Sequence, residues 1–366
     1  MKQFNVGIIG ATGMVGQRFI MLLHDHPWFN IKLLAASPRS AGKKYADVVD
    51  GRWAMTEEIP ESVRDMVIYD ATADVEKIAE QVDFVFCAVD MNKDEIKALE
   101  EKYAKAECPV VSNNSAHRHT PDVPMIIPEI NPDHAEIIEA QRKRLGTKRG
   151  FIAVKSNCSL QSYLPALAVI NEKYPIDKAL VTTYQAISGA GKTFKTWPEM
   201  VDNLIPYIGG EEMKSEVEPN KILGKIKDGE IVPSSALSIE CQTYRVPVSD
   251  GHTAAIFFSF KDKDNKPSVK EIEDMWREYK GEPQKLELPH APKQFIYVYT
   301  EDEQPDKPQI KEAREIDGGM AISCGRLRES AQYDYKMVSM SHNTLRGAAG
   351  GAVLMAELLA AKGYLD

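Results

Sequence analysis

Cysteine is scarce in this chain and long apolar runs are missing. Its 366 residues include five cysteines, an odd number that is scattered and contains no C-x-x-C pair. This pattern indicates neither a disulfide framework nor a zinc site. No apolar run reaches the roughly 18 residues of a membrane span. The opening residues, MKQFNVGIIGATG, also lack the features of a signal peptide, so we expect a cytoplasmic protein that does not enter a membrane.

Basic residues are in deficit as well. The chain has 45 Lys and Arg against 54 Asp and Glu, which gives a net charge of −9. A nucleic-acid-binding protein would need a surplus of positive charge on one face, so the composition argues against that class but allows a local basic pocket. With 43% hydrophobic and 27% charged residues, the chain is typical of a globular protein of one or two large domains.

The first part of the chain alternates short apolar runs with helical stretches. This alternation predicts an α/β fold with a doubly wound parallel sheet and helices on both of its faces. A helix is expected from the end of the first strand to about His24. The expected strands are Phe4 to Ile9, Ile31 to Ala36, Met66 to Tyr69, Asp83 to Val89, Pro109 to Ser112 and Phe151 to Lys155.

Longer β-rich runs begin near residue 178 and predict a second domain with a mostly antiparallel sheet. Its expected strands are Ala179 to Ile187, Ser238 to Val246, Thr253 to Phe260, Gln294 to Thr300 and Gly319 to Leu327. The charged segment 300–311 is expected to be an exposed loop. Residues 343–366 are rich in Ala and Leu and have one amphipathic register, which predicts a C-terminal helix.

The turn after the first expected strand contains Gly10, Gly13 and Gly16. A strand, a Gly-rich turn and a helix together bring backbone N–H groups close to a pyrophosphate at the helix N-terminus. The spacing is G-x-x-G-x-x-G, which differs from the commoner G-x-G-x-x-G. We interpret it as a nucleotide-binding turn, and a purely structural turn is the alternative.

The loop after the second expected strand indicates which dinucleotide is used. No Asp or Glu occurs between Asp25 and Asp47, whereas Arg39 follows the strand directly, with Lys43 and Lys44 close behind. An acidic residue there would bind the ribose hydroxyls of NAD, and an arginine would accept the 2′-phosphate of NADP. The loop therefore favours NADP, and a merely solvated basic loop is the alternative.

Cys158 is the candidate nucleophile. It lies between an expected strand and an expected helix, where the partial positive charge of a helix N-terminus would stabilise a thiolate. Cys87 lies inside an apolar run and fits a buried small hydrophobe. The remaining cysteines offer no helix start, and they are Cys108, Cys241 and Cys324.

His252 and Arg245 are the candidate partners of Cys158. His252 lies in a turn that opens onto an expected strand, where it could act as the base of a nucleophilic cysteine. Arg245 is seven residues earlier and could bind a substrate carboxylate through its guanidinium fork. A buried structural histidine and a surface ion pair are the alternatives.

A Gly-rich segment, Ser188 to Thr193, resembles the end of a P-loop. A P-loop would need glycine at position 186, where the chain has Ala186, so ATP hydrolysis is excluded. A structural turn after a strand explains the segment, and a contact to cofactor or substrate is the functional alternative.

A set of motifs resembles the aspartate-β-semialdehyde dehydrogenases, in that family's order and across essentially the whole chain. The loop 37–45 and the context of Cys158 resemble the archaeal and fungal branch. The motifs are Gly10-x-Thr12-Gly13-x-x-Gly16, Ser156-Asn157-Cys158, Gln185-Ala-Ile-Ser-Gly-Ala-Gly, Gly210-Glu-Glu-Met-Lys214, Arg245-Val-Pro-Val-x-x-Gly251-His252 and Asn343-Thr-Leu-Arg-Gly-Ala-Ala-Gly350.

The resemblance implies reversible, phosphate-dependent reduction of 4-phospho-L-aspartate to L-aspartate 4-semialdehyde with NADP as cofactor. The reaction serves lysine, threonine, methionine and isoleucine biosynthesis. It implies a Rossmann-type NADP-binding domain over residues 1–156, completed by the helix 343–366. It also implies an α+β catalytic and dimerisation domain over residues 157–342. The expected assembly is a homodimer, or a dimer of such dimers.

The resemblance also implies the roles of single residues. Cys158 would form a covalent thioacyl intermediate, and His252 would move protons at the thiol and at the carbonyl oxygen. No metal is implied. The implied substrate and phosphate contacts are Gln185, Arg245, Asn157, Arg118, Lys214 and Glu211, with Glu212 as the alternative to Glu211. The implied cofactor contacts are Gly10, Thr12, Gly13, Met14, Val15, Ser37, Arg39, Ser40, Ser188, Gly189, Gly191 and Asn343.

Other functions remain open at this point. A malonyl-CoA reductase on the same scaffold would use the same cysteine and histidine on a thioester. N-acetyl-glutamyl-phosphate reductase shares the chemistry, but its surroundings of His and Arg match less well. A non-catalytic NADP-sensing regulator would need the glycine turn but not Cys158, Arg245 and His252 together.

Overall fold

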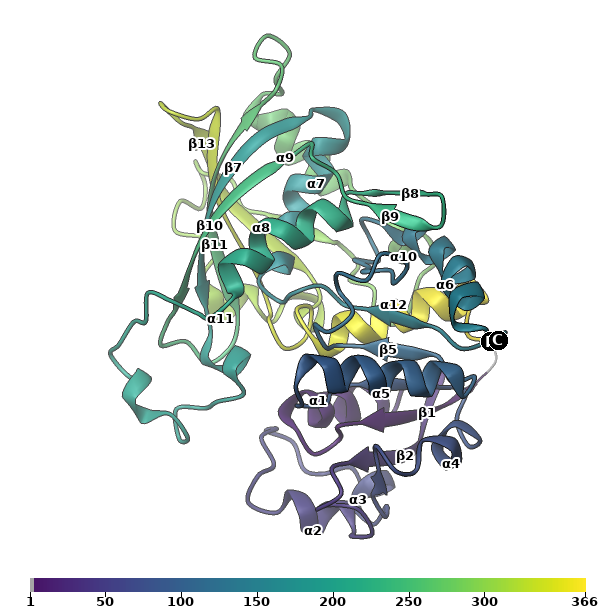
Figure 1. Cartoon of the computed structure of the whole chain (residues 1–366). Coiled ribbons are helices and arrows are strands. Elements are labelled where there is room, and N and C mark those ends of the chain that lie inside the picture. The colour runs from purple at the N-terminus through teal and green to yellow at the C-terminus, as the bar shows by residue number, and fades with distance from the viewer. Residues whose placement is uncertain (1–2) are drawn as a thin grey trace.

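The computed structural model describes residues 3–366 and contains two large sheets (Figure 1). The first is a parallel sheet of six strands in the order β3-β2-β1-β4-β5-β6. This order reverses direction between β1 and β4, which is the switch point where doubly wound folds bind ligands. The strands are β1 (Phe4–Ile9), β2 (Phe29–Ala36), β3 (Tyr69–Asp70), β4 (Phe84–Cys87), β5 (Val110–Ser112) and β6 (Ile152–Val154).

Helices cover both faces of the first sheet. On one face, α1 (Met14–Leu23) and the C-terminal α12 (Ala349–Ala361) pack on alternate side chains of the strands, such as Val6 and Ile8. On the other face, α5 (Lys93–Lys105) packs on Val85. Shorter helices fill the connections, and they are α2 (Tyr45–Val49), α3 (Glu61–Arg64), α4 (Val75–Ala79), η1 (Pro132–Ile137) and α6 (Ile138–Leu145).

The second sheet has six strands in the order β10-β7-β11-β14-β13-β12. Its β7–β11, β11–β14 and β13–β14 pairs are antiparallel, and its β10–β7 and β12–β13 pairs are parallel. The mostly antiparallel sheet is therefore confirmed. The strands are β7 (Ile176–Gln185), β10 (Ser238–Arg245), β11 (His252–Phe260), β12 (Ile296–Val298), β13 (Ile322–Glu329) and β14 (Tyr335–Ser341).

Helices α7 (Leu164–Lys173), α8 (Glu211–Ile222) and α9 (Val269–Glu278) lie on one side of the second sheet (Figure 1). Leu167, Ile272 and Trp276 join inward-facing strand residues in a core that is continuous with one face of the first sheet. The small hairpin β8 (Lys225–Lys227) and β9 (Glu230–Val232) follows α8. The remaining short helices are η2 (Leu160–Ser162), η3 (Ile187–Ala190), η4 (Pro198–Met200), α10 (Glu282–Lys285), α11 (Ile310–Ala313) and η5 (Ile316–Gly319).

Three sequence expectations differ from the structure. The C-terminal helix begins at Ala349 rather than at residue 343, and it is buried on every side from Ala349 to Leu359 rather than along one stripe. Strand β13 begins at Ile322 because Gly318 and Gly319 adopt positive φ angles before it. The third strand is only Tyr69–Asp70. Among residues 3–366, no helix combines the length and apolar character needed to cross a bilayer.

Candidate active site

Cys158 and His252 lie against each other, as their proposed partnership requires. The distance from Cys158 Sγ to His252 Nε2 is 3.4 Å. Cys158 is in the turn after β6 and is partly exposed, whereas His252 opens β11 and is fully buried. The other ring nitrogen, His252 Nδ1, accepts a hydrogen bond from the backbone N–H of Ala186 at 3.0 Å. The imidazole is therefore fixed at both of its nitrogens.

The local electrostatics of Cys158 differ from the sequence expectation. Cys158 precedes the short 3₁₀ helix η2, and the α-helix α7 begins only at Leu164. The dipole of a long helix therefore does not act on its sulfur. Burial, reinforced by the Glu211 carboxylate, raises the pKa of the Cys158 thiol, and nearby cations oppose this shift only in part. The surroundings of Cys158 therefore do not lower its pKa in the way that a helix N-terminus would.

Three strand ends bring the other polar groups to the sulfur. Gln185 is the register partner of both His252 and Arg245. All three residues therefore lie side by side at the same end of strands β7, β10 and β11. Arg245 Nη1 donates to the carbonyl of Ala186 at 2.7 Å. A Cβ atom on Gly189 would lie 3.0 Å from Arg245 Nη1 and 3.3 Å from His252 Cε1. Glycine at 189 therefore leaves room for both side chains.

Glu211 is the acidic centre of the site. Its carboxylate accepts hydrogen bonds from Asn157 Nδ2 at 3.0 Å, Gln185 Nε2 at 3.2 Å and Lys214 Nζ at 2.7 Å. Burial raises the pKa of Glu211, but these donors and the Lys214 charge outweigh burial and hold it below its ordinary value. Glu212 instead accepts from the backbone N–H of Thr243 at the edge of β10. Of the two neighbouring glutamates, Glu211 is the one that lies in the site.

The two expected phosphate ligands are each already paired with a carboxylate. Arg118 Nη1 donates to Glu218 at 2.9 Å, and Arg118 Nε donates to the carbonyl of Lys155 at 2.9 Å. Lys214 is paired with Glu211. Each cation is held by a carboxylate of α8, and a phosphate would have to share them with these carboxylates.

The glycine turn after β1 fits a dinucleotide. Gly10 has φ of +89°, and a Cβ there would lie 2.3 Å from the carbonyl oxygen of Ala88. A Cβ on Gly16 would lie 2.3 Å from the carbonyl oxygen of Gly10. Gly13 is exposed and has only the Gly10 carbonyl oxygen near it, at 3.6 Å. The turn thus needs Gly10 and Gly16 to fold, and Gly13 faces open space that a pyrophosphate can approach.

The remaining expected cofactor contacts surround this turn. Thr12, Met14 and Val15 are partly exposed beside Gly13. The loop after β2 carries the exposed Ser37 and Arg39, and Ser40 folds back so that its N–H donates to the Ser37 carbonyl at 2.9 Å. Within residues 3–366, Arg39 forms no ion pair. Its guanidinium is therefore available to an added anion.

Asn343 connects two turns of the site. Its Oδ1 accepts from the N–H of Gly251 at 2.7 Å, and its Nδ2 donates to Ser188 Oγ at 2.9 Å. The two hydrogen bonds of the Asn343 amide hold Ser188 beside the turn that leads into His252. The neighbouring Gly191 has φ of +66°, and the space where a Cβ would lie is open.

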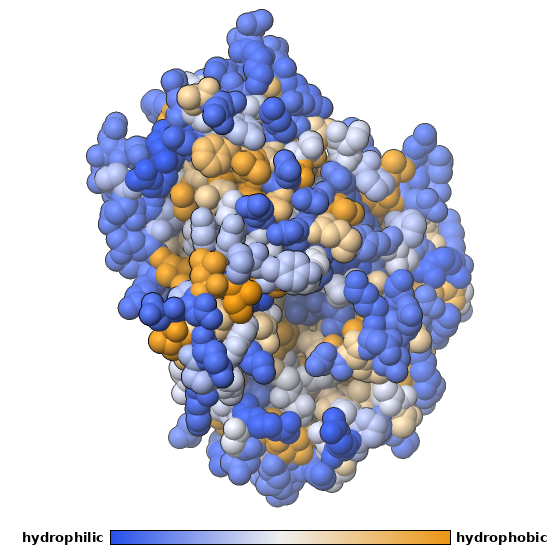
Figure 2. All heavy atoms as spheres, turned by 60° about the vertical axis from the view of Figure 1, so that its left-hand side comes forward, coloured by the Kyte–Doolittle hydropathy of each residue, from blue (hydrophilic) through white to orange (hydrophobic). Residues whose placement is uncertain are grey.

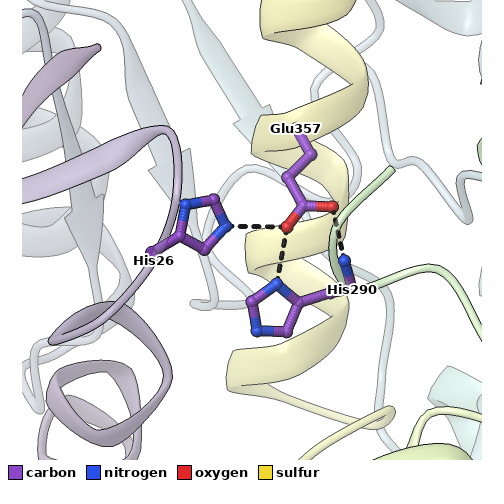
Figure 3. Close-up of side chains that lie close together, drawn as sticks. All are labelled: His26, His290 and Glu357. Carbon is purple, nitrogen blue, oxygen red and sulfur yellow. Dashed lines mark hydrogen bonds and ion pairs between the residues drawn. The ribbon is translucent and has the colours of Figure 1, made fainter. Parts of the chain in front are cut away.

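A cluster of possible metal ligands lies elsewhere, beside α12 (Figure 3). His26 Nε2 and His290 Nδ1 both contact Glu357 Oε1, at 2.8 and 2.6 Å. His26 Nδ1 accepts the N–H groups of Trp28 and Phe29, each at 3.0 Å, so its proton is on Nε2 and points to Glu357. A metal would need the lone pair that this proton occupies. We interpret the cluster as a structural connection.

Comparison with known proteins agrees with this geometry. Residues 5–138 match the family model described as semialdehyde dehydrogenase, NAD binding domain, and residues 167–346 match semialdehyde dehydrogenase, dimerisation domain. The aspartate-semialdehyde dehydrogenase of Methanothermobacter thermautotrophicus is 43% identical over 97% of this chain and 98% of that protein. The Saccharomyces cerevisiae enzyme of the same name is 42% identical over 98% of each chain.

The chain belongs to the aspartate-semialdehyde dehydrogenase family. A crystal structure of the Candida albicans family member with NADP has a TM-score of 0.89 and 41% identity to this chain, covering 99% of this chain and all of that one. The predicted membership, archaeal and fungal in character, and the predicted α/β fold are therefore confirmed.

Sequence analysis missed two residues of the aspartate-semialdehyde dehydrogenase site. Glu218 holds Arg118 and also accepts the backbone N–H of Asn157 at 2.7 Å. It follows Glu211 by two turns of α8, so helical spacing could have indicated it. Lys155 is fully buried beside Cys158, and only its closeness in sequence to the cysteine pointed to it.

Proposed function

We propose that this chain catalyses the NADP-dependent reduction of 4-phospho-L-aspartate to L-aspartate 4-semialdehyde and phosphate, and the reverse reaction. The observation that carries the proposal is the contact between Cys158 and His252, with Arg245, Gln185 and Glu211 arranged around it. The relatives that support it match almost its whole length. The product would serve amino-acid biosynthesis, and we expect the enzyme to act in the cytoplasm.

The substrate contacts follow from charge and geometry. The Arg245 guanidinium would bind the α-carboxylate of the substrate as a bidentate fork. The Glu211 carboxylate would accept from the substrate ammonium, and Gln185 and Asn157 hold that carboxylate in place. Arg118 and Lys214 would neutralise the acyl phosphate and the phosphate that leaves.

The covalent step belongs to Cys158. Its sulfur attacks the acyl carbon, the bond from that carbon to the phosphate oxygen breaks, and a thioester forms. When bound, NADPH would supply the hydride that reduces this thioester, and the aldehyde would then leave the sulfur of Cys158. His252 Nε2 lies close enough to the sulfur to donate its proton to the carbonyl oxygen as negative charge builds there.

The glycine turn would hold the pyrophosphate of the cofactor, through Gly10, Thr12, Gly13, Met14 and Val15.

Two further loops would complete the cofactor site. Arg39, with Ser37 and Ser40, would bind the 2′-phosphate that distinguishes NADP from NAD. Ser188, Gly189, Gly191 and Asn343 would line the nicotinamide end, because the hydrogen bonds of Asn343 place these turns beside Cys158 and His252.

We propose that residues 1–156 and 343–366 form the NADP-binding domain and that residues 157–342 form the catalytic and dimerisation domain. The outer face of the second sheet supports a homodimer. Its outward side chains remain partly exposed, and Figure 2 turns this side forward and shows hydrophobic residues in groups among hydrophilic ones. The outward residues include Leu180, Thr182, Tyr184, Tyr244, Ala255, Phe257 and Val338.

The deciding experiment measures NADPH formation from L-aspartate 4-semialdehyde, NADP and inorganic phosphate. We expect NADP reduction that stops when phosphate is omitted and that is much weaker with NAD. NADP reduction that proceeds equally well without phosphate would contradict the acyl-phosphate route. If the chain is active only in a second assay with malonyl-CoA and NADPH, the malonyl-CoA reductase alternative replaces the proposal. No activity in either assay would favour a non-catalytic regulator.

The covalent mechanism is tested by Cys158→Ala. We expect turnover to fall by at least about 10³-fold, because no other group in the site can form a thioester. NADP binding, measured by fluorescence titration, should be unchanged because Cys158 is not part of the glycine turn. Substantial residual turnover would contradict the covalent route.

A further inference from the structure

Cys158 and His252 come from separate segments of the chain, and both segments are attached to one buried turn. This anchoring turn, residues 342–347, lies between β14 and α12. It is tightly folded, because a Cβ on Gly347 would lie only 2.4 Å from the carbonyl oxygen of Asn343. The side chains of the anchoring turn are therefore held in a fixed relation to one another.

Asn343 attaches the anchoring turn to the segment of His252. Its Oδ1 accepts the backbone N–H of Gly251, the residue directly before His252, at 2.7 Å. Its Nδ2 donates to Ser188 Oγ at 2.9 Å. The start of β11 is therefore tied to this turn by a short side chain.

Arg346 attaches the same turn to the domain of the first sheet. Its guanidinium binds the Glu129 carboxylate as a fork, in which Nη1 donates to Oε1 at 2.7 Å and Nη2 donates to Oε2. Both side chains are buried, and the guanidinium carbon lies 4.8 Å from the ring centroid of Phe295. Two donor groups of the guanidinium are thus used by Glu129, and the Nε–H remains for another partner.

That partner is Gln161, in the short helix that follows Cys158. Arg346 Nε donates to Gln161 Oε1 at 3.0 Å. Because arginine is only a donor, the amide oxygen of Gln161 has to face it, and the amide NH₂ points to the other side. There Gln161 Nε2 donates to Ser156 Oγ at 2.9 Å, and both residues are buried. Arg346 is therefore connected to the loop two residues before Cys158.

We propose that Arg346 is a positioning residue for Cys158. Through Gln161 it holds the cysteine loop on the anchoring turn, and through Asn343 the same turn holds the segment of His252. Arg346 thereby sets the 3.4 Å separation between the sulfur and His252 Nε2, without acting on the reacting atoms itself. The inference rests on Cys158 being the nucleophile, as proposed above. A misplacement of about 1 Å can cost a reaction about a hundredfold in rate.

The first test is Arg346→Lys in the full-length enzyme. Lysine keeps a positive charge beside the buried Glu129, but a single ammonium cannot replace the planar fork that holds Glu129 and Gln161 together. We expect kcat to fall by about tenfold to a hundredfold. Alkylation of Cys158 by iodoacetamide, followed by peptide mass spectrometry, should slow by about tenfold, because the sulfur is no longer held against its hydrogen-bond partner.

The Michaelis constant separates this role from a general loss of structure. The proposed substrate contacts Arg245 and Glu211 are held by other groups, namely the carbonyl of Ala186 and the side chains of Asn157 and Lys214. We therefore expect KM for the semialdehyde to change by less than about threefold in Arg346→Lys. Steady-state kinetics with varied substrate give both constants.

Gln161→Met interrupts the same connection at its second link. Methionine is similar in size but cannot join Arg346 to Ser156, and the ion pair of Arg346 with Glu129 is left intact. We expect a loss of kcat similar to that of Arg346→Lys. The double variant that combines the two substitutions should lose no more than the weaker of the single variants, because both interrupt one chain of hydrogen bonds.

Arg142→Lys is the matched control. The Arg142 guanidinium also lies over a phenylalanine, 5.3 Å from the ring centroid of Phe151, and its Nη2 donates to the carbonyl of Tyr364 at 2.9 Å. It thus connects the C-terminal segment beyond the other end of α12. We expect this variant to keep the kcat and the alkylation rate of the wild type.

Two results would overturn the inference. One is a folded Arg346→Lys enzyme with the kcat and the alkylation rate of the wild type. The other is a double variant whose losses are the product of the two single losses. If circular dichroism shows that Arg346→Lys does not fold, Gln161→Met decides the question, and a wild-type kcat in that variant would refute the inference.

Failure of the proposed function would look different. A wild-type enzyme that does not reduce NADP with the semialdehyde and phosphate, or an active Cys158→Ser variant, would refute the function. The alkylation rates need no substrate, so they would still test whether Arg346 positions Cys158. Unchanged alkylation and kcat in Arg346→Lys, with an active wild type and an inactive Cys158→Ser, would refute only this inference.

Discussion

At the scale of single residues, Gly189 controls the geometry of Arg245 and His252. An added Cβ would lie 3.0 Å from Arg245 Nη1, which is held by the carbonyl of Ala186 and cannot move without losing that bond. We expect Gly189→Ala to lower kcat/KM for the semialdehyde by about tenfold to a hundredfold, because overpacking costs about 1–3 kcal/mol. Steady-state kinetics measure this effect.

Gly146→Ala is the control for that prediction. Gly146 ends α6 with a positive φ of +73° and has nothing close to its Cβ position. Alanine there should cost about 1 kcal/mol of stability and leave kcat/KM nearly unchanged, because Gly146 is not part of the proposed site. Equal losses of activity in the two variants would show that a general loss of stability, and not the space beside Arg245, explains the effect of Gly189→Ala.

Arg245→Lys separates charge from geometry. Lysine keeps the positive charge but replaces a planar fork with a single ammonium. We expect KM for the semialdehyde to rise by about tenfold or more while kcat changes less, because the carboxylate lies away from the reacting carbon. Steady-state kinetics with varied substrate give both constants. An unchanged KM would remove Arg245 from the proposed carboxylate site.

The sequence predicted which residues form the site, but it did not predict how their side chains are oriented or how their pKa values are shifted. The motifs around Cys158, His252 and Arg245 pointed to side chains that the structure brings together. The orientation of the His252 ring depends on the backbone N–H of Ala186, sixty-six positions away in sequence, which no local pattern reveals. The raised pKa of the Cys158 thiol depends on burial and on Glu211, and both are products of tertiary packing.

At the scale of elements, helix α12 is anchored by Glu357. Its buried carboxylate accepts from His26 before β2, and from both the ring and the backbone N–H of His290 (Figure 3). We expect Glu357→Gln to lower the free energy of unfolding by about 2 kcal/mol at pH 7, because hydrogen bonds to a charged acceptor are replaced by weaker ones. Urea titration measures this loss.

The same anchor has a defined pH dependence. Burial raises the pKa of Glu357, but the two histidines lower it more, so the folded value lies below the ordinary 4.5. A carboxyl with a lowered folded pKa stabilises the protein fully above its unfolded pKa and loses that contribution as pH falls through the folded value. The difference in the free energy of unfolding between the wild type and Glu357→Gln should therefore become smaller below about pH 4.5.

A surface ion pair near the end of the same helix provides the control. Lys362 pairs with Glu282 at 3.0 Å, and both side chains are partly exposed. Glu282→Gln should cost less than about 1 kcal/mol. A loss as large as that of Glu357→Gln would show that the end of α12, rather than its buried carboxylate, determines stability.

Elements with a clear apolar period were predictable, and those without one were not. The buried strands β1, β2 and β4 are short apolar runs, and the sequence indicated all three. Strand β14 (Tyr335–Ser341) was missed because Met337 and Val338 are adjacent apolar residues and two of its buried positions are serines, so polar and apolar residues do not alternate strictly. Helix α8 was missed because it is highly charged and contains Pro219, and it is held largely by contacts with β10.

At the scale of the whole molecule, the outer face of the second sheet, on the side away from α7, α8 and α9, keeps its outward side chains partly exposed. Ala255 lies at its centre on β11, opposite Thr182 on one neighbouring strand and Val338 on the other. In a two-fold symmetric dimer, this position would face its counterpart or a close neighbour. A large charged side chain at position 255 would remain solvated in a monomer but would be buried without a partner in the dimer.

We therefore expect Ala255→Arg to convert a homodimer into monomers, as measured by light scattering after size exclusion. Val67→Arg is the matched control, because Val67 is 55% exposed but lies beside the first sheet. It should leave the assembly unchanged, and the same measurement distinguishes a dimer from a dimer of dimers. If Ala255→Arg stays dimeric, subunits associate through another surface, and the exposed apolar residues of this sheet face need a different partner.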